Sequence, residues 1–246
     1  MRERSTPVDA VRAFGVMLGG PVALLGAVAA AVATTGRALR RGGAPPRWAG
    51  ATLVVTALYA AVTRPWLRQW GATADERRLP LPGDDLVPEP AVQSTRAVTV
   101  HAPAAAVWPW LAQIGQDRGG FYSYAWLENL AGCRMRNADH IHPEWQRREV
   151  GETVKLHWAS GLPVALFEPG HALGLAGWGV FALRPIDAGS TRLLARQRLR
   201  PGPGRWAYSL LLELPHFVME RGMLLGVKRR AELAAGWPVG RPGGGR

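Results

Sequence analysis

The chain of 246 residues contains little cysteine and almost no lysine. Cys133 is its single cysteine, which excludes an internal disulfide and a cysteine-ligated metal site within one chain. Lys155 and Lys228 are the only lysines among 30 basic residues, so arginine supplies nearly all of the formal charge of +12. Arginine is spread along the whole sequence, and no nucleic-acid-binding motif is present. We therefore expect no nucleic-acid partner, although a pI of about 11.3 attracts polyanions in general.

Motifs of common enzyme classes are also missing, because the chain has no nucleophile elbow, phosphate-binding loop or triad pattern. The densest titratable group is Asp139, His140, His142 and Glu144. The two histidines could share a metal on a strand, but Pro143 indicates a loop and no third ligand has a suitable spacing. We therefore expect no metal and no cofactor. Asp139, His140 and Glu144 stay candidates for acid–base catalysis, since histidine titrates near neutral pH.

Charge is absent from residues 13–36, a run long enough as a helix to cross the hydrocarbon core of a membrane. A second run, bounded by Trp48 and Trp66, has tryptophans where a membrane interface would place them. We predict that residues 1–66 contain a transmembrane helical hairpin, 13–36 and 48–66. A cleaved signal peptide is the alternative, but it leaves the second run without a purpose. The arginines on the outer flanks slightly exceed those of the connecting loop, so we expect a two-span cell-membrane protein with a cytoplasmic domain.

The remaining chain divides into three parts. Residues 67–94 are predicted to be an extended, polar linker, because Pro80, Pro82, Pro88 and Pro90 interrupt them. Residues 95–235 are predicted to be an α+β domain, in which a first strand (95–101) is followed by two short helices, several antiparallel strands and a long C-terminal helix. Residues 236–246, rich in Gly, Pro and Arg, are expected to be a disordered tail.

Two parts of this domain carry specific expectations. Arg192, Arg196 and Arg198 share one face of a predicted strand, and we expect that face to be solvated; the alternative is an inward face that binds a ligand carboxylate or phosphate. Leu193, Ala195 and Leu199 would then face the interior. In the last helix, Leu214, Val218, Gly222 and Leu225 line one face, and Gly222 and Gly226 should allow close approach to a sheet. Pro109 and Pro215 should each bend or restart a helix, and Glu220 and Arg221 could pair with the arginine row.

Aromatic residues crowd the stretch 118–146, where polar side chains are threaded between them. An apolar wall with a few placed polar groups is typical of small-molecule pockets, although core packing alone would use the same residues. Our candidate ligand-binding residues, in this stretch and beyond it, are Trp108, Phe121, Tyr122, Tyr124, Trp126, Trp145, Trp158, Trp178, Phe181 and Phe217.

Four segments of the domain resemble a known family. They read VHAPAAAVWPWLAQIGQDRGGFYSYAWLENLAG, ADHIHPEWQ, TRLLARQRLR and PHFVMERGMLLGVKRRAE. In this order they are similar to membrane-anchored actinobacterial members of the SRPBCC superfamily, the START-like or polyketide-cyclase-like helix-grip proteins. The resemblance covers about residues 95–235. It implies a curved antiparallel sheet around the C-terminal helix with a deep cavity between them, and relatives that bind lipids, polyketides or hormones, only some being enzymes.

Three functions follow as hypotheses. The first is a membrane-anchored domain that binds a hydrophobic small molecule or lipid in an internal cavity. The second is a cyclase- or dehydratase-type enzyme acting on a polyketide-like or isoprenoid substrate, which requires Asp139, His140 and Glu144 to converge inside that cavity. The third is a structural or regulatory membrane protein whose core is filled by its own side chains. We expect a binding protein more than an enzyme.

Overall fold

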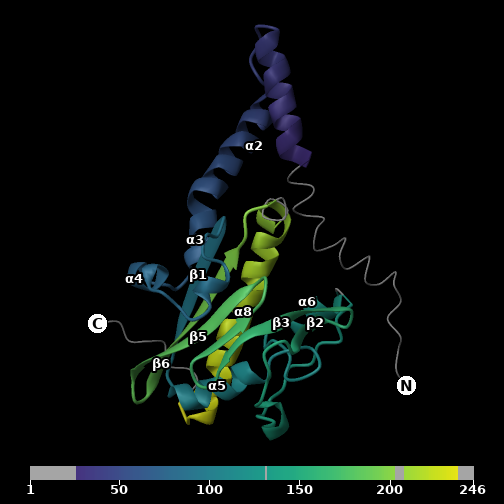
Figure 1. The fold of residues 1–246 in the computed structure, drawn as a ribbon. Coiled ribbons are helices and arrows are strands. Elements are labelled where there is room, and N and C mark those ends of the chain that lie inside the picture. Colours follow the sequence, from purple (N-terminus) through teal and green to yellow (C-terminus); the bar gives the residue numbers. More distant parts are fainter. Residues whose placement is uncertain (1–25, 131, 203–207, 238–246) are drawn as a thin grey trace.

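The computed structural model of the protein describes residues 26–130, 132–202 and 208–237 (Figure 1). An antiparallel sheet with a long C-terminal helix forms the main body, and a helical arm projects from it (Figure 1). The strands are β1 (Val92–Val100), β2 (Thr153–His157), β3 (Ser160–Glu168), β4 (Ala172–Leu175), β5 (Gly179–Asp187) and β6 (Ser190–Leu199). The longer helices of the body are α5 (Ala104–Ala112) and α8 (Glu213–Ala234). The predicted α+β class is confirmed.

The sheet has the order β1-β6-β5-β4-β3-β2, so β1 and β2 are its two edges. Side chains of β1, β5 and β6 alternate between two faces, as the pleat requires. The inner face contributes Val100, Phe181 and Leu193 to a core shared with α5 and α8. The outer face contributes Ala97, Val180 and Leu194 to a second, smaller core. A sheet that packs one face against a long C-terminal helix fits the predicted helix-grip arrangement.

The buried face of α8 differs from the predicted one. Leu214 and Val218 are exposed, whereas the face toward the body contains both apolar and acidic residues. The tight contact at Gly226 is also with a different partner, because a Cβ there would collide with the carbonyl oxygen of Tyr122. A loop that contains Tyr122 therefore crosses α8 at its glycines, where we expected the sheet. The buried residues of α8 are Glu213, Phe217, Glu220, Met223, Leu224, Val227, Ala231 and Glu232.

The two prolines act differently. Pro215 lies near the start of α8, where a short π-helix, η4 (Tyr208–Leu212), passes into the α-helix. A new α-helical segment therefore begins close to this proline, as expected. Pro109 lies inside α5 without splitting it. That helix ends three residues later, and its buried residues Trp108, Trp110 and Leu111 hold it against the core. Tertiary packing thus outweighs the local cost of the proline.

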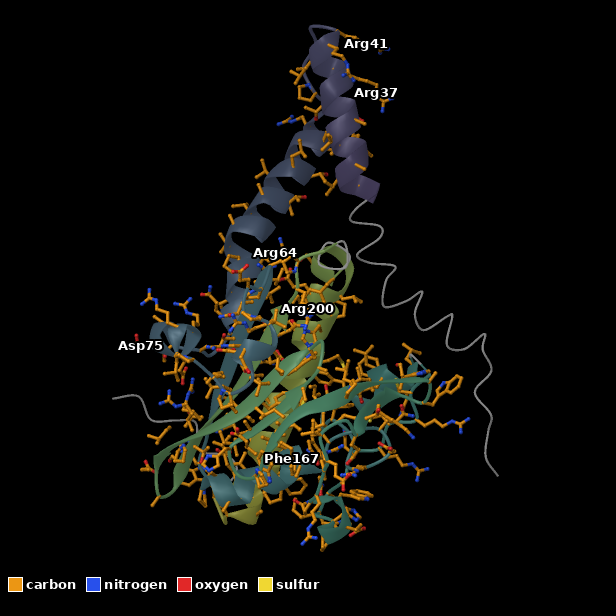
Figure 2. The ribbon with its side chains drawn as sticks, in the orientation of Figure 1. Arg37, Arg41, Arg64, Asp75, Phe167 and Arg200 are labelled. Atoms are coloured by element: carbon orange, nitrogen blue, oxygen red, sulfur yellow. The ribbon has the colours of Figure 1, made fainter. Side chains whose placement is uncertain are left out.

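The arm consists of a helix over residues 26–40, then α2 (Arg47–Leu58), a π-turn η1 (Tyr59–Thr63) and α3 (Arg64–Gln69). Figure 2 shows Arg37 and Arg41 near the far end of the arm and Arg64 near the body. The π-helical turn η1 ends two residues before Pro65, which has no backbone N–H to donate to the helical hydrogen-bond ladder. Of the predicted hairpin, residues 13–25 lie outside the described residues. Among the described residues, no helix is both long and apolar enough to cross a membrane.

The helical arm continues past residue 66 to Gln69, and its end packs on the body. Trp66 and Trp70 both contact Phe217 of α8, with ring centroids 5.5 and 6.4 Å apart. Leu67 is buried, and its carbonyl oxygen accepts a hydrogen bond from Arg96 of β1. The backbone N–H of Ala97 donates to the carbonyl of Trp70, so α3 also covers an otherwise open sheet edge.

The predicted linker is a packed strap, which we define as residues 71–87. It contains α4 (Ala74–Arg78), capped by Thr73 and Glu76 in a reciprocal capping box, and the short helix η2 (Asp84–Leu86). Leu81 of the strap is buried against the outer face of the sheet. The prolines therefore terminate short elements rather than keep the segment extended. In Figure 1 the strap lies on the side of the body remote from α6 (Ala125–Leu130).

Candidate functional site

The arginine row holds the strap in place. It lies on the outer face as expected, with Leu193 and Ala195 inside, but it is not solvated. Arg196 is only 2% exposed and donates to Asp84 at 2.6 Å and to the carbonyls of Leu79 and Glu76. Arg192 binds the Glu76 carboxylate at 2.6 and 2.7 Å. A buried arginine needs such partners, which explains why this chain segment covers the row.

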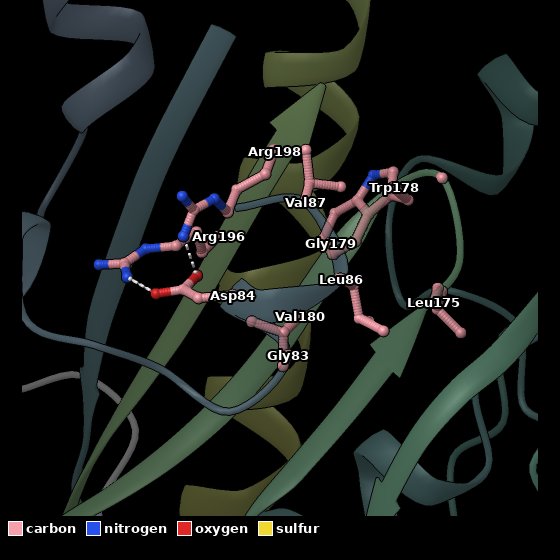
Figure 3. Close-up of a pocket in the computed structure, with 11 residues that line it drawn as sticks. Gly83, Asp84, Leu86, Val87, Leu175, Trp178, Gly179, Val180, Arg196 and Arg198 are labelled. Atoms are coloured by element: carbon pink, nitrogen blue, oxygen red, sulfur yellow. Dashed lines mark hydrogen bonds and ion pairs between the residues drawn. The ribbon is translucent and has the colours of Figure 1, made fainter. Parts of the chain in front are cut away.

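A recess beside these arginines is too small for an organic ligand. Figure 3 shows Asp84 beside Arg196 and Arg198, and Trp178 and Val180 are among the other residues that line the recess. The recess has a volume of about 20 Å³, which accommodates about one water molecule. We therefore assign the residues around this recess a structural role, which is to hold the strap on the sheet.

The predicted acidic–histidine cluster lies at the surface. The side chains of Asp139 and His140 are 92% and 68% exposed, and their atoms Oδ1 and Nδ1 are 2.7 Å apart. Glu144 is 64% exposed and approaches His142 at 3.2 Å. The hydrogen bond from His140 holds the pKa of the Asp139 carboxyl below its usual value. The convergence in an interior that the enzyme hypothesis requires is not seen in the described part of the chain.

A buried side chain nevertheless holds the backbone of the loop that contains His140 and His142. The side chain of Gln113, which is fully buried, donates to the carbonyl of His140 at 3.1 Å and accepts from the N–H of His142 at 3.0 Å. The rings of His142 and Trp145 stack with centroids 3.9 Å apart. Within residues 26–130, 132–202 and 208–237, no three His, Cys, Asp or Glu side chains are grouped so that they could hold a metal ion.

The ten aromatic candidates separate into three groups. Trp108, Tyr122, Phe181 and Phe217 are buried in or beside the core. Phe121, Trp145 and Trp178 are half-buried. Tyr124, Trp126 and Trp158 are exposed. The structure does not bring all ten around one space.

A different group of polar residues lies between the first half of α8 and the inner face of the sheet. We call it the inner polar cluster, and its members are Ser94, Arg96, Gln197, Tyr208, His216 and Glu220. Three of the six come from β1 and β6, which pair Ser94 directly opposite Gln197. The other three come from η4 and α8, and Trp178 at the start of β5 flanks them.

Hydrogen bonds fix the protonation state of His216. The indole N–H of Trp178 donates to Nε2 of His216 at 3.0 Å, so Nε2 must be unprotonated. Nδ1 is 2.6 Å from the hydroxyl of Tyr208, which donates to Oε1 of Gln197 at 2.6 Å. The hydroxyl has one proton, so Nδ1–H is the donor in this arrangement. Burial lowers the pKa of His216 and raises that of Tyr208, so both are neutral near pH 7.

The charged pair of the cluster is incompletely bonded. Arg96 and Glu220 form an ion pair with side chains 0% and 2% exposed. Nη2 of Arg96, Oε1 of Glu220 and the hydroxyl of Ser94 are buried and have no hydrogen-bond partner among the described residues. Oε1 of Glu220 is 4.0 Å from Nε2 of His216. Each unpartnered buried group costs about 1–3 kcal/mol, so a bound polar group that satisfied them would stabilise the fold.

The arm is fastened at the same end of α8. Both Arg64 and Arg68 of α3 pair with Glu213, whose side chain is 2% exposed. Glu213 stands one helical turn before His216 and Phe217 and two turns before Glu220. The carboxylate that holds the arm and the groups of the inner polar cluster therefore share one helix face.

The sequence prediction missed the inner polar cluster. It expected Glu220 to pair with the arginine row, which lies on the outer face of the sheet. Glu220 instead pairs with Arg96 on the inner face. The available signal was the spacing of Glu213, His216 and Glu220, which places two acids and a histidine on the face that also contains Phe217. Such polar residues on a buried helix face are informative because they must be paired there.

Similarity to known proteins is slight. No protein-family model and no curated protein matches the chain. A search of solved structures finds the solution NMR structure of a polyketide-cyclase-like protein from Corynebacterium glutamicum. The two share 16% sequence identity, the alignment covers 58% of this chain and 93% of that chain, and the TM-score is 0.32. A TM-score this low carries no argument, so membership of the SRPBCC superfamily stays a prediction.

Proposed function

We propose that the protein is a membrane-associated binding protein for an apolar molecule with a neutral polar end. The inner polar cluster is the observation on which this rests. Replacing a buried ion pair by apolar residues is often neutral or stabilising, so keeping Arg96 and Glu220 in the interior calls for a purpose besides stability. The unpartnered atoms include a donor, an acceptor and a hydroxyl. A ligand hydroxyl or carboxamide could satisfy them, because it donates and accepts.

The surroundings of the cluster suit the apolar part of such a molecule. Trp178 stacks on Phe181 with ring centroids 4.6 Å apart, and Phe217 lies on the same helix face as His216 and Glu220. These aromatic side chains form an apolar wall directly beside the polar groups, as ligand sites generally do. Access would require the loop at Tyr122–Tyr124 to move, because the Ser123 hydroxyl donates to the carbonyl of Met219 on α8.

The arm supplies the proposed association with the membrane. Val54, Val55, Leu58 and Val62 are more than half exposed along one continuous helical segment, together with Trp48 and Trp66 near its ends. Exposed aliphatic residues bounded by tryptophans are the pattern of a segment in contact with lipid. We propose the cell membrane as the location and the cytoplasm as the side that holds the body.

Native mass spectrometry of the full chain, released from mild detergent, tests the binding proposal, with solvent extraction of anything bound. We expect a reproducible apolar adduct in the wild type. Ser94→Ala should reduce its occupancy about tenfold, because the unpartnered Ser94 hydroxyl is one of the groups that the ligand would satisfy and one such hydrogen bond contributes roughly this much. Ser160→Ala is the matched control because Ser160 is exposed. A folded chain at its bare mass, even after incubation with a lipid extract, would overturn the proposal.

A second candidate is a structural or regulatory membrane protein with a filled core. The close packing of the loop at Tyr122 on Gly226 favours it, because there is no space for even a methyl group at this contact. The same experiment separates the two, since a filled core predicts the bare mass under all conditions.

A further inference from the structure

Two tryptophans are exposed near β2, at the edge of the sheet opposite β1, on which the arm packs. Trp126 on α6 is 69% exposed, and Trp158 between β2 and β3 is 66% exposed. Tryptophan carries a large apolar ring system and is seldom left in water without a partner to cover it. Leu130 and Leu156 are also exposed, by 46% and 38%.

These four side chains belong to one surface, although they come from separate segments of the chain. Cys133, just after α6, approaches the carbonyl oxygen of Leu156 with its Sγ at 3.6 Å. Its backbone N–H donates to the carbonyl of Glu128 within α6. In Figure 1, α6 lies beside β2 and β3. We call this surface the aromatic tip: Trp126, Leu130, Leu156 and Trp158.

The surroundings of the aromatic tip are basic. Arg134 and Arg136, which follow α6, are exposed, and so is Lys155 of β2, whose Nζ lies 3.5 Å from a carboxylate oxygen of Asp117. Glu128 is the only acidic residue in the segments 125–136 and 153–160, and it is half-buried. Exposed aromatic residues with a cationic rim are complementary to a surface that presents anions above an apolar layer. Tryptophan side chains with arginines around them suit the interface of a bilayer, where indole rings lie at the headgroup level and guanidinium groups meet lipid phosphates.

We propose that the aromatic tip docks on an anionic lipid bilayer. Trp126 and Trp158 enter the boundary between headgroups and acyl chains, and Arg134 and Arg136 bind lipid phosphates through their guanidinium groups. This contact is separate from the arm, and it does not depend on a ligand in the inner polar cluster. It brings the loop that crosses α8 at Gly222 and Gly226 next to the membrane, because that loop leads directly into α6.

The test must report on the aromatic tip while the arm is intact. Cys133 is first changed to Ser, so that a new cysteine carries the only label. Ala159→Cys, in the exposed turn next to Trp158, is labelled with the environment-sensitive dye NBD in the full chain. Ala188→Cys, in the exposed turn between β5 and β6, is the matched control. Both are mixed with phosphatidylcholine vesicles, with and without about 30% phosphatidylglycerol, a content chosen to give the strongly anionic surface the proposal requires.

We expect the label at residue 159 to shift to the blue and brighten severalfold with anionic vesicles, and the label at residue 188 to stay unchanged. Trp126→Ser with Trp158→Ser should abolish the shift, and Arg134→Ala with Arg136→Ala should weaken vesicle affinity at the tip at least tenfold. A label at 159 that stays in water while the chain is bound to vesicles would overturn the proposal. A shift without vesicles that grows with protein concentration would also overturn it, by assigning the tip to self-association.

Discussion

Gly226 is a residue whose replacement the fold tolerates poorly on simple steric grounds. Gly226→Ala places a methyl group against the Tyr122 carbonyl and 2.8 Å from the Tyr122 Cβ, so either α8 or the loop must move. We expect a loss of about 2–4 kcal/mol in the free energy of unfolding, measured by chemical denaturation. Gly50→Ala in α2 is the control, because nothing lies within 4 Å of a Cβ there. It should leave stability unchanged or raise it by up to about 1 kcal/mol. Equal losses in both variants would contradict the steric argument.

Glu128 gives a prediction about pH. Burial raises its pKa from the ordinary 4.5 to about 7. The folded state therefore binds this proton more tightly than the unfolded state does, and the resulting stability is fully present below pH 4.5 and is lost as the pH rises through 7. One pKa unit corresponds to about 1.4 kcal/mol, but the group is partly exposed, so solvent screening reduces the whole effect to about 1–2 kcal/mol.

Glu128→Gln should therefore be more stable than the wild type by about 1–2 kcal/mol at pH 8 and equal to it at pH 4, where both side chains are neutral. Denaturation curves over this pH range provide the measurement. The exposed Glu168→Gln should show no such pH-dependent difference. The hypothesis fails if Glu128→Gln has the same advantage at both pH values.

At the scale of elements, the strap depends on one buried guanidinium. Arg196→Met removes the donor to the carbonyls of Glu76 and Leu79 and one of the partners of Asp84, which keeps the Leu81 N–H and Arg198, so we expect a loss of about 3 kcal/mol. Hydrogen exchange should show reduced protection in residues 71–87 before the rest of the protein opens. Arg184→Met on β5 is the control, since Arg184 is exposed. Equal protection of the strap in both variants would show that Arg196 does not hold it.

The same element shows where sequence reasoning succeeded and where it did not. Alternation in 191–200 correctly predicted which side chains of β6 face inward, because a strand has a period of two residues. It could not predict what covers the other face. The partners of Arg196 stand more than 100 residues earlier, and their polar, proline-containing segment reads locally as a linker.

The inner polar cluster was difficult to predict for a similar reason. Arg96 and Glu220 are 124 residues apart in sequence, and neither lies in a recognisable motif. The acidic–histidine stretch at 139–144 attracted attention because its members are adjacent in sequence. Adjacent titratable residues commonly lie in solvated loops, whereas a buried site gathers its members through the fold. The aromatic tip follows the same pattern, because its two tryptophans come from different elements.

For the whole molecule, the proposed function predicts a change in thermal stability on removal of the ligand. A molecule that binds only the folded state at about 100 times its dissociation constant adds about 2.7 kcal/mol. In a chain of this size that corresponds to a rise in Tm of about 5–10 °C. Protein stripped by solvent extraction and refolded should therefore melt lower than the protein as purified, and addition of the extract should restore the Tm. Identical Tm values in all three samples would favour the filled-core alternative.

The docking of the arm has a consequence for biosynthesis. Arg64 and Arg68 find Glu213 across 149 and 145 residues of sequence, and the Arg96–Glu220 pair spans 124. α8, which completes these contacts, leaves the ribosome well after the arm. At ordinary elongation rates, about 10–30 s pass between synthesis of α3 and synthesis of its partner. Throughout that interval the arm lacks its contacts with α8, so the association with lipid that we propose for the arm can precede closure of the domain.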